Sequence, residues 1–386
     1  MDRRLLLVLS YGNFVVGVGA FVIIGIVSPI ASAFAISKAE AGLFMTVYAV
    51  TYAVSSPVLT AMAGKLDRRL LLVASMAIFV LASAFSALAW NVTTLALARV
   101  MAAIGAGLFT PTSAAVAVAT ADPQNRPAAL ARVFLGLTLA QILGVPVGGY
   151  LGYTLDWHVA FWVVVAIGMV ALGLLIRLVS AGLPFQPTSL AMLGKVLTNP
   201  RQVAAVLFTV TFLGAVYCVY TYIGPLAEER LKLGGTGVTM LLLAFGLGAV
   251  TGNAFGAVLT RKFGPDKTLL GLCLAQAIYL PSMSMLDAGL YPMLALTFLW
   301  STFGWSFMVP QQLRLVALAP EAQSVILSLN AAAIYVAASF GSAVGGVAFS
   351  RFGLSTTGIA GTVIALSGAL LLTLLRRRTH GVSSKP

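Results

Sequence analysis

The stretch Leu143-Gly144-Val145-Pro146-Val147-Gly148-Gly149 lies in the middle of an apolar run that extends from about residue 130 to residue 153. Pro146 removes a helix hydrogen bond and the glycines remove side chains, a combination that would end a helix in water. The run is long enough to cross a bilayer, however, and a backbone surrounded by lipid must keep its hydrogen bonds. We therefore predict a transmembrane helix with a kink, whose glycine face lets a second helix come close.

The same pattern recurs in the second half of the chain, at Phe340-Gly341-Ser342-Ala343-Val344-Gly345-Gly346. Gly144, Gly148 and Gly149 recur there as Gly341, Gly345 and Gly346, with an offset of 197 residues each time. Lys65 and Lys262 are related by the same offset, which is about half of the chain. We interpret the protein as two similar halves that meet along such helices.

The composition indicates an integral membrane protein. Hydrophobic residues make up 60% of the chain and charged residues only 9%, whereas a soluble domain carries about 25% charged residues. The net charge of +13 does not point to nucleic acid, because the basic residues lie in short loops between apolar runs. Cys218 and Cys273 lie inside such runs, so we expect buried single thiols and neither a disulfide nor a metal site.

Twelve apolar runs are long enough to span a bilayer, and all are too long for the strands of a membrane barrel. We predict an all-α membrane protein with twelve transmembrane helices in two pseudo-symmetric bundles of six. The expected domains are a bundle at 1–179, a linker at 180–200 that is rich in Pro and Gly, and a bundle at 201–386. The runs lie at about 5–36, 40–63, 70–90, 93–119, 130–153, 158–179, 201–227, 235–260, 267–286, 291–318, 322–350 and 354–375.

The distribution of Lys and Arg predicts the orientation of the chain. If the N-terminus is cytoplasmic, 18 of the 23 basic residues fall on the inner side, four fall on the outer side, and Arg99 lies within a span. Such an imbalance places both termini in the cytoplasm. We therefore expect a multi-pass protein of a bacterial inner membrane.

Several motifs, taken in order along nearly the whole chain, resemble the major facilitator superfamily. Gly64-Lys65-Leu66-Asp67-Arg68-Arg69 is similar to the family's loop between spans two and three. Arg99 with Gly105 and Gly107 is similar to its fourth-span motif, and Gly144 to Gly149 to the fifth-span motif of its antiporters. The run from Trp157-His158 to Phe161-Trp162 resembles the drug, purine-nucleoside and arabinose efflux branch.

The chain departs from this family pattern in its first span. Related efflux proteins often carry a glutamate in a Gly-x-x-Glu-Phe-like stretch, but Gly17-Val18-Gly19-Ala20-Phe21 has Ala20 at that place. Every Asp and Glu of the chain lies in a loop or at the end of a span, and so do both histidines. Proton coupling needs a group that titrates as a cavity opens, so a carboxylate such as Glu228 or Glu40 would have to enter the cavity mouth, or the protein is weakly coupled.

Arg99 is the basic residue that lies well inside a span. An intramembrane charge costs about 2.5–3.5 kcal/mol or more, so we expect Arg99 to face protein or water. It either snorkels or bonds backbone carbonyls, or it acts as the proton-relay or anion-binding arginine that the resemblance implies.

By analogy with the family, spans one, two, four and five of each half line a central cavity. We expect their polar and aromatic residues to bind the substrate, although packing between helices explains the aromatic ones equally well. The candidates are Asn13, Phe21, Tyr48, Tyr52, Arg99, Gln141, Tyr217, Tyr220, Asn253, Trp300, Trp305, Asn330 and Tyr335.

A second set of residues is expected to control the change of conformation. Asp67 can cap a neighbouring helix or pair with basic residues of the other half, and such a contact would hold an inner gate shut. Alternatively, these residues lie in a solvated loop whose charges only determine the orientation of the chain in the membrane. The candidates are Gly64, Asp67, Arg68, Gly144, Pro146, Gly148, Gly149, Gly341 and Gly345.

We expect a secondary transporter that exports a small organic solute, such as a drug, nucleoside, sugar or amphipathic metabolite, by alternating access, with exchange for protons left open. The alternative is an uptake symporter or an uncoupled facilitator of a nutrient. An intramembrane enzyme would need a His/Glu metal pair, paired Asp or a Ser/His dyad, and an ATP-driven pump would need a phosphate-binding loop, so neither is expected. The expected partners are the solute, protons and the bilayer, with no cofactor, no nucleic acid and a monomeric chain.

Overall fold

The computed structural model describes residues 3–63, 66–122, 126–183, 190–320 and 322–380. Among these residues, twelve helical segments are long and apolar enough to cross a membrane, and none of the described residues forms a strand. The predicted all-α fold with twelve spans is therefore confirmed. The contacts divide the chain into unit 1 (Met1–Thr188) and unit 2 (Ser189–Pro386), which are described separately below.

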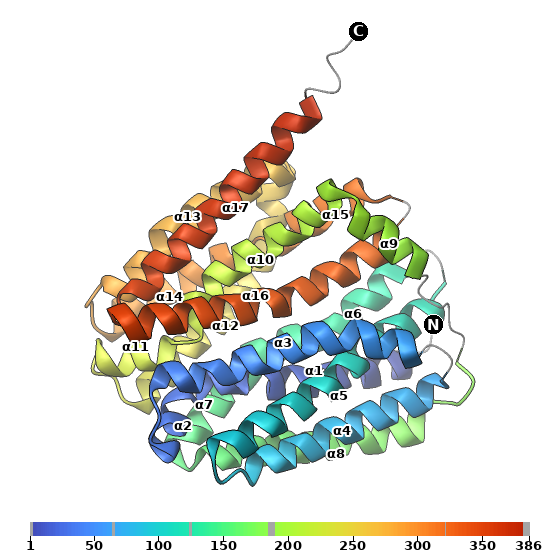
Figure 1. Cartoon of the computed structure of the whole chain (residues 1–386), viewed down its shortest axis with the longest axis horizontal. Helices are drawn as coiled ribbons and strands as arrows, with labels where there is room; N and C mark the ends of the chain where they lie inside the picture. Colours follow the sequence, from blue (N-terminus) through green and yellow to red (C-terminus); the bar gives the residue numbers. More distant parts are fainter. Residues whose placement is uncertain (1–2, 64–65, 123–125, 184–189, 321, 381–386) are drawn as a thin grey trace. The chain divides into compact units, whose positions relative to one another are not determined.

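Unit 1, coloured blue to green in Figure 1, contains six spans. Its first span ends at a break near Gly25, and its fifth span consists of two α-helices joined by a π-helical turn, η3. The elements are α1 (Arg3–Gly25), α2 (Val27–Phe34), α3 (Lys38–Met62), α4 (Arg68–Ala87), α5 (Val92–Ala119), α6 (Arg126–Leu139), η3 (Ala140–Gly144), α7 (Val145–Thr154) and α8 (Trp157–Leu178).

Unit 2, coloured green to red in Figure 1, contains six further spans after one additional short helix, α9 (Leu190–Thr198), and its first and fourth spans each consist of two helices. The additional helix falls inside the predicted linker and was not anticipated. The six spans comprise α10 (Pro200–Tyr220) with α11 (Ile223–Glu229), α12 (Gly235–Phe263), α13 (Pro265–Met285), α14 (Leu290–Trp305) with α15 (Met308–Leu318), α16 (Gln323–Phe352) and α17 (Thr356–His380).

The span around Pro146 stays helical, as its apolar flanks predict. Pro146 has no N–H to donate to the carbonyl of residue 142, and the chain forms the π turn of η3 immediately before it. A π turn is wider than an α-helical turn and is a common cause of helix kinks. The structure thus places an irregular turn where the sequence predicts a kink.

The glycine face of this span receives the first helix of the same unit. A Cβ atom at Gly144 would lie 2.6 Å from Val18 Cγ2, and one at Gly148 would lie 2.4 Å from Val22 Cγ2. Glycines four residues apart thus form a groove that accepts β-branched side chains four residues apart on α1. The predicted close approach of a second helix is confirmed, but that helix belongs to the same half, so Gly144 and Gly148 do not form the predicted contact between the two halves. Gly149 and Pro146 are also buried.

In unit 2, the corresponding glycines bring α16 against α10, which is again the first span of its unit. A Cβ atom at Gly341 would lie 2.2 Å from the carbonyl oxygen of Gly214, and one at Gly345 would lie 2.4 Å from that of Cys218. Here the glycines face backbone atoms rather than side chains, so the two helix axes approach closely. Both cysteines, Cys218 and Cys273, are buried free thiols, as expected.

Candidate functional site

Arg99 is buried in the middle of unit 1, with only 1% of its surface exposed. It lies on α5, whose first turn is closed by a capping box between Asn91 and Thr94. Its Nη1 donates to the carbonyl of Gly19 at 2.6 Å and its Nη2 to that of Ala20 at 2.9 Å. The guanidinium carbon lies 4.5 Å from the centre of the Tyr48 ring, within the range of a cation–π contact.

The positive charge of Arg99 is not balanced by a carboxylate among the described residues. Its Nε is buried and has no hydrogen-bond partner in the same part of the chain. Two carbonyl dipoles and one aromatic face offset part of the desolvation cost, but the site keeps a net positive charge. Such a site attracts an anionic or electron-rich group.

Ala20, the residue that stands where related proteins often carry a glutamate, contacts Arg99 through its backbone carbonyl. All the carboxylates that the structure describes lie at helix ends or in connections, as the sequence predicts. Glu40 is in the first turn of α3, Asp156 is the N-cap of α8, and Glu228 and Glu229 end α11. The bonds of Arg99 to the backbone thus take the place of an embedded ion pair.

Asn13 connects the first and fourth spans of unit 1. Its Nδ2 donates to Leu9 O at 2.9 Å and to Ser113 Oγ at 2.8 Å, while the Ser113 hydroxyl donates to Thr110 O. A carbonyl only accepts, so this geometry fixes which end of the amide is Nδ2. Asn13 Oδ1 is then left buried without a partner among the described groups.

Gln311 makes the corresponding contact in unit 2, although the sequence analysis did not include it. Its Nε2 donates to Ala205 O at 2.7 Å and to Thr209 Oγ1 at 2.9 Å, and the Thr209 hydroxyl donates to Asn330 Oδ1. Gln311 is fully buried, and its Oε1 has no partner in the described part of the chain. Both units therefore place one buried amide oxygen, with unused acceptor capacity, beside the contact of their first and fourth spans.

Three of the predicted aromatic candidates of unit 2, Tyr217, Tyr220 and Trp300, lie in one buried cluster. Tyr220 stacks on Phe245 with ring centres 3.9 Å apart, and Trp300 meets Phe245 edge-on at 5.1 Å. Tyr217 lies 6.1 Å from Tyr220. Trp300 Nε1 donates to Gln276 Oε1 at 2.9 Å. Phe245 and Gln276 were not predicted, because an aromatic or amide residue on an apolar span gives no sign of which face it occupies.

The remaining candidates are placed along the helices of their own unit. Phe21, Tyr52, Trp305 and Tyr335 are buried, and Asn253 is half-buried, with its Nδ2 3.4 Å from Ala249 O. Gln141 lies in the π turn and is partly buried. Their role in binding a substrate remains a prediction.

Asp67 binds backbone groups at one end of unit 1. Its Oδ1 accepts from Leu70 N–H at 3.0 Å, which caps α4, and its Oδ2 accepts from Gly182 N–H at 2.9 Å. The N–H of Gly182, and then that of Leu70, hold the pKa of the Asp67 carboxyl below its usual value. Arg68 beside it is buried, and Gly64 lies outside the described residues. The gate role of these residues remains a prediction.

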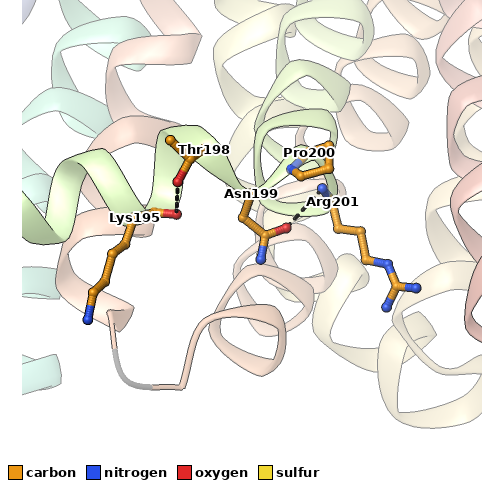
Figure 2. Close-up of a pocket in the computed structure, with 5 residues that line it drawn as sticks. All are labelled: Lys195, Thr198, Asn199, Pro200 and Arg201. Carbon is orange, nitrogen blue, oxygen red and sulfur yellow. Dashed lines mark hydrogen bonds between the residues drawn. The ribbon is translucent and has the colours of Figure 1, made fainter.

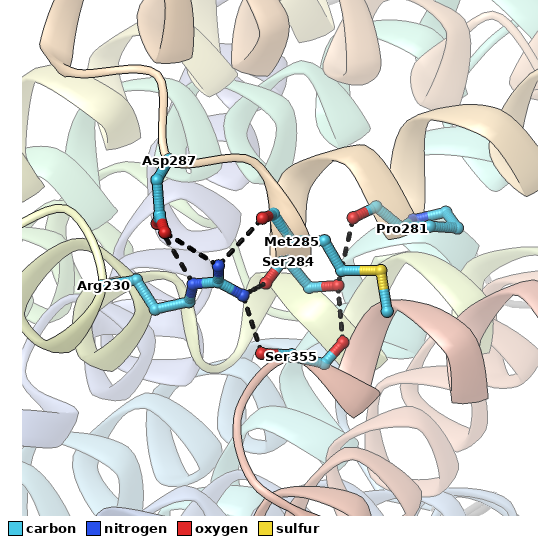
Figure 3. A network of polar contacts seen from close by, with 6 residues as sticks. All are labelled: Arg230, Pro281, Ser284, Met285, Asp287 and Ser355. Carbon is cyan, nitrogen blue, oxygen red and sulfur yellow. Dashed lines mark hydrogen bonds and ion pairs between the residues drawn. The ribbon is translucent and has the colours of Figure 1, made fainter.

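Two arginines that sequence reasoning did not single out organise unit 2. Arg230 follows α11 and forms a saturated network, in which Nε and Nη2 contact the Asp287 carboxylate at 3.2 and 3.1 Å (Figure 3). Its Nη1 donates to Ser284 O and Ser355 Oγ at 2.6 and 2.7 Å. Arg314, on α15, pairs with Asp266 at 3.3 Å. In the sequence, these two arginines look like any basic loop residue that only determines the orientation of the chain in the membrane.

Comparison with known proteins identifies the family. The sequence pattern of the Major Facilitator Superfamily matches residues 9–342. The chain is 30% identical to the inner membrane transport protein YdhP of Escherichia coli K12, over 97% of this chain and 96% of that protein.

Two solved structures share the fold at 17% sequence identity and a TM-score of 0.75. One is a bacterial homologue of the human lysosomal transporter Spinster, with 98% of each chain covered. The other is the D-xylose–proton symporter, with 96% of each chain covered. The chain is thus a multi-pass membrane protein that belongs to the Major Facilitator Superfamily of transporters.

Proposed function

We propose that this protein exports a small organic solute by alternating access, and that an acidic or acceptor-rich group of the solute is drawn to Arg99. Membership of the superfamily supports transport by alternating access. The resemblance of the fifth-span glycines to those of antiporters supports export. The charge of Arg99 supports the chemical class of the solute.

The buried guanidinium of Arg99 is the observation that carries the choice of solute. Its two bonds go to neutral carbonyls, so its charge is not cancelled and acts at low local dielectric once alternating access opens a path to it. The Tyr48 ring lies 4.5 Å from the guanidinium carbon and supports the guanidinium from one side. A solute with an acidic group gains from this charge, whereas a cationic solute of the same shape would be repelled.

A second candidate function is uncoupled facilitation or proton-linked uptake of a nutrient. It is favoured by the peripheral position of the described carboxylates and by Ala20, whose carbonyl bonds Arg99 where related proteins often supply a titrating side chain. The D-xylose–proton symporter shares the fold with this chain, but at 17% identity that likeness extends only to the fold.

Transport into inside-out vesicles separates these functions. Vesicles containing the full chain would be offered matched pairs of solutes, each an aromatic acid and its neutral amide, with and without an imposed pH gradient. Export predicts accumulation of the acid above that of the amide. If the acid enters the vesicles at a rate that does not depend on the pH gradient, and does not accumulate, the protein is a facilitator instead.

Variants at position 99 test the role of the guanidinium. Arg99→Gln should abolish the preference for the acid over the amide, and Arg99→Lys should keep part of it. Arg351→Gln, at the exposed end of α16, is the control and should leave the preference unchanged. An unchanged preference in Arg99→Gln would refute the proposed contact.

We also place the protein in a bacterial inner membrane with both termini in the cytoplasm. The distribution of Lys and Arg supports this orientation, and YdhP is described as an inner membrane protein. Single cysteines at Lys262 and Lys232 should react with an impermeant maleimide from opposite sides of the membrane. Labelling of both from one side would refute the assigned topology.

A further inference from the structure

The elbow between α9 and α10 forms an open hollow of about 570 Å³ on unit 2 (Figure 2). It is lined by Lys195, Thr198, Asn199, Pro200 and Arg201. The hollow lies where a membrane span begins, because the tenth helix and its span both start at Pro200. The residues of the elbow are therefore expected at the boundary between lipid and water.

The amide of Asn199 turns its donor end away from the helix. Asn199 Oδ1 accepts from the backbone N–H of Arg201 at 3.0 Å and of Gln202 at 3.4 Å, so its Nδ2 is turned away from the helix. The Thr198 hydroxyl donates back to Gly194 O at 2.9 Å. Because Asn199 already occupies the backbone N–H groups, any ligand of the hollow must be bound by side chains.

Lys195 and Arg201 supply two positive charges on either side of the Asn199 amide (Figure 2). Both are exposed, and neither forms an ion pair with a carboxylate that the structure describes. Two cations and an amide donor, with no acidic group among the lining residues, are complementary to a phosphate.

Helix α9 packs on unit 2 through a buried valine and also carries an exposed apolar residue. Val196 is buried in a cluster with Ala205, Leu315 and Ile326. The next residue, Leu197, is 54% exposed. The start of a membrane span at Pro200 favours a phospholipid over a free phosphate as the ligand, because a phospholipid headgroup lies at the boundary between lipid and water.

We propose that the elbow of Lys195, Asn199 and Arg201 is a binding site for the headgroup of an anionic phospholipid at the edge of the membrane. Juxtamembrane basic residues attract anionic lipids in general. Here the two cations line one hollow from opposite sides of a fixed amide donor, so a headgroup held at the amide gains from both charges. The site does not depend on the direction of transport or on the solute.

Native mass spectrometry of the detergent-solubilised full chain tests this site. Short-chain phosphatidylglycerol would be titrated, with phosphatidylcholine of the same acyl length and inorganic phosphate as the other arms. We expect retained phosphatidylglycerol, weak retention of phosphatidylcholine, and no displacement by phosphate at equal concentration. Equal retention of the two lipids, or displacement by phosphate, would overturn the proposal.

Paired variants distinguish the site from diffuse attraction to a basic surface. Loss of each cation should weaken binding about fivefold, so the double variant Lys195→Gln/Arg201→Gln should weaken it about 25-fold. The matched control is Arg261→Gln/Lys262→Gln, two adjacent exposed cations at the end of α12, which should leave binding unchanged. Equal losses in the two double variants would refute a defined site.

A variant in which Lys195 and Arg201 exchange residue types keeps both charges, so it shows whether a loss of binding comes from lost charge or from misfolding. Lys195→Arg/Arg201→Lys should retain binding within about twofold, because the two charges remain. Circular dichroism and size-exclusion elution would confirm that each variant is folded. Loss of phosphatidylglycerol binding in this folded exchange variant would show that net charge at the elbow is not what binds the lipid, and would overturn the proposal.

Discussion

Replacement of Gly341 by alanine should separate α16 from α10 and destabilise unit 2. The new Cβ would lie 2.2 Å from the carbonyl oxygen of Gly214, which is 1.2 Å less than the 3.4 Å at which van der Waals contact becomes ordinary. The obstructing atom belongs to the backbone, so no side chain can rotate away. The two helices must therefore move apart by roughly 1 Å, which costs between a quarter and a half of the dispersion energy of each contact along the seam.

The expected magnitude has two parts of opposite sign. Overpacking typically costs about 1–3 kcal/mol, and an obstruction by backbone belongs at the upper end, about 3 kcal/mol. Alanine is better than glycine in a helix by about 1 kcal/mol, which offsets part of this cost. We expect the Gly341→Ala variant to lose about 2 kcal/mol of unfolding free energy.

Gly271→Ala is a matched control in the same unit. Gly271 lies inside α13, is exposed, and has no atom within 4 Å of the position that its Cβ would occupy. This variant gains the helix preference without the clash, so the difference between the two variants, about 3 kcal/mol, isolates the packing cost. Titration with SDS in mixed micelles, followed by tryptophan fluorescence, measures the difference. Equal unfolding free energies would refute the close approach of the two helices.

Three further perturbations test other contacts. Arg230→Lys cannot reproduce the forked network around Asp287, so it should lower the unfolding free energy by about 1–2 kcal/mol, and an unchanged value in the same SDS titration would contradict the network. The lowered pKa of Asp67 means that its contribution to stability is complete above the usual carboxyl pKa and is lost as the pH falls through the lowered one. Asp67→Asn should therefore show a smaller loss of thermal stability than the wild type between about pH 5 and pH 3, and parallel curves would exclude this carboxylate as the cause. Ala20→Glu brings a carboxylate into the neighbourhood of Arg99, so it should weaken transport of acidic solutes and make transport depend on pH; unchanged pH dependence would show that position 20 does not govern coupling.

The positions of the spans were predictable because each is an apolar run of the length that a bilayer requires. An irregular turn at Pro146 was predictable from its missing N–H, and close packing at the glycines was predictable from their missing side chains, but the π form of the turn was not. The peripheral position of the carboxylates followed from the same span boundaries.

The contacts of individual polar side chains were not predictable. Arg99 bonds the carbonyls of Gly19 and Ala20, and a carbonyl is present at every residue, so no pattern of side chains reveals which one is used. Gln311 finds Ala205 and Thr209 more than a hundred positions away along the chain. Val196 of α9 is buried against Ala205, Leu315 and Ile326, which all come from other helices.

In the two units, the amide and the hydroxyl of this contact come from opposite spans. In unit 1, the first span supplies the amide of Asn13 and the fourth supplies the hydroxyl of Ser113, whereas in unit 2 the first span supplies the hydroxyl of Thr209 and the fourth supplies the amide of Gln311. The 197-residue offset carries Asn13 and Ser113 to positions 210 and 310, each one residue from its counterpart. If the halves descend from a duplicated ancestor, what was inherited at this junction is a bond between two helices, and its donor and acceptor have traded places.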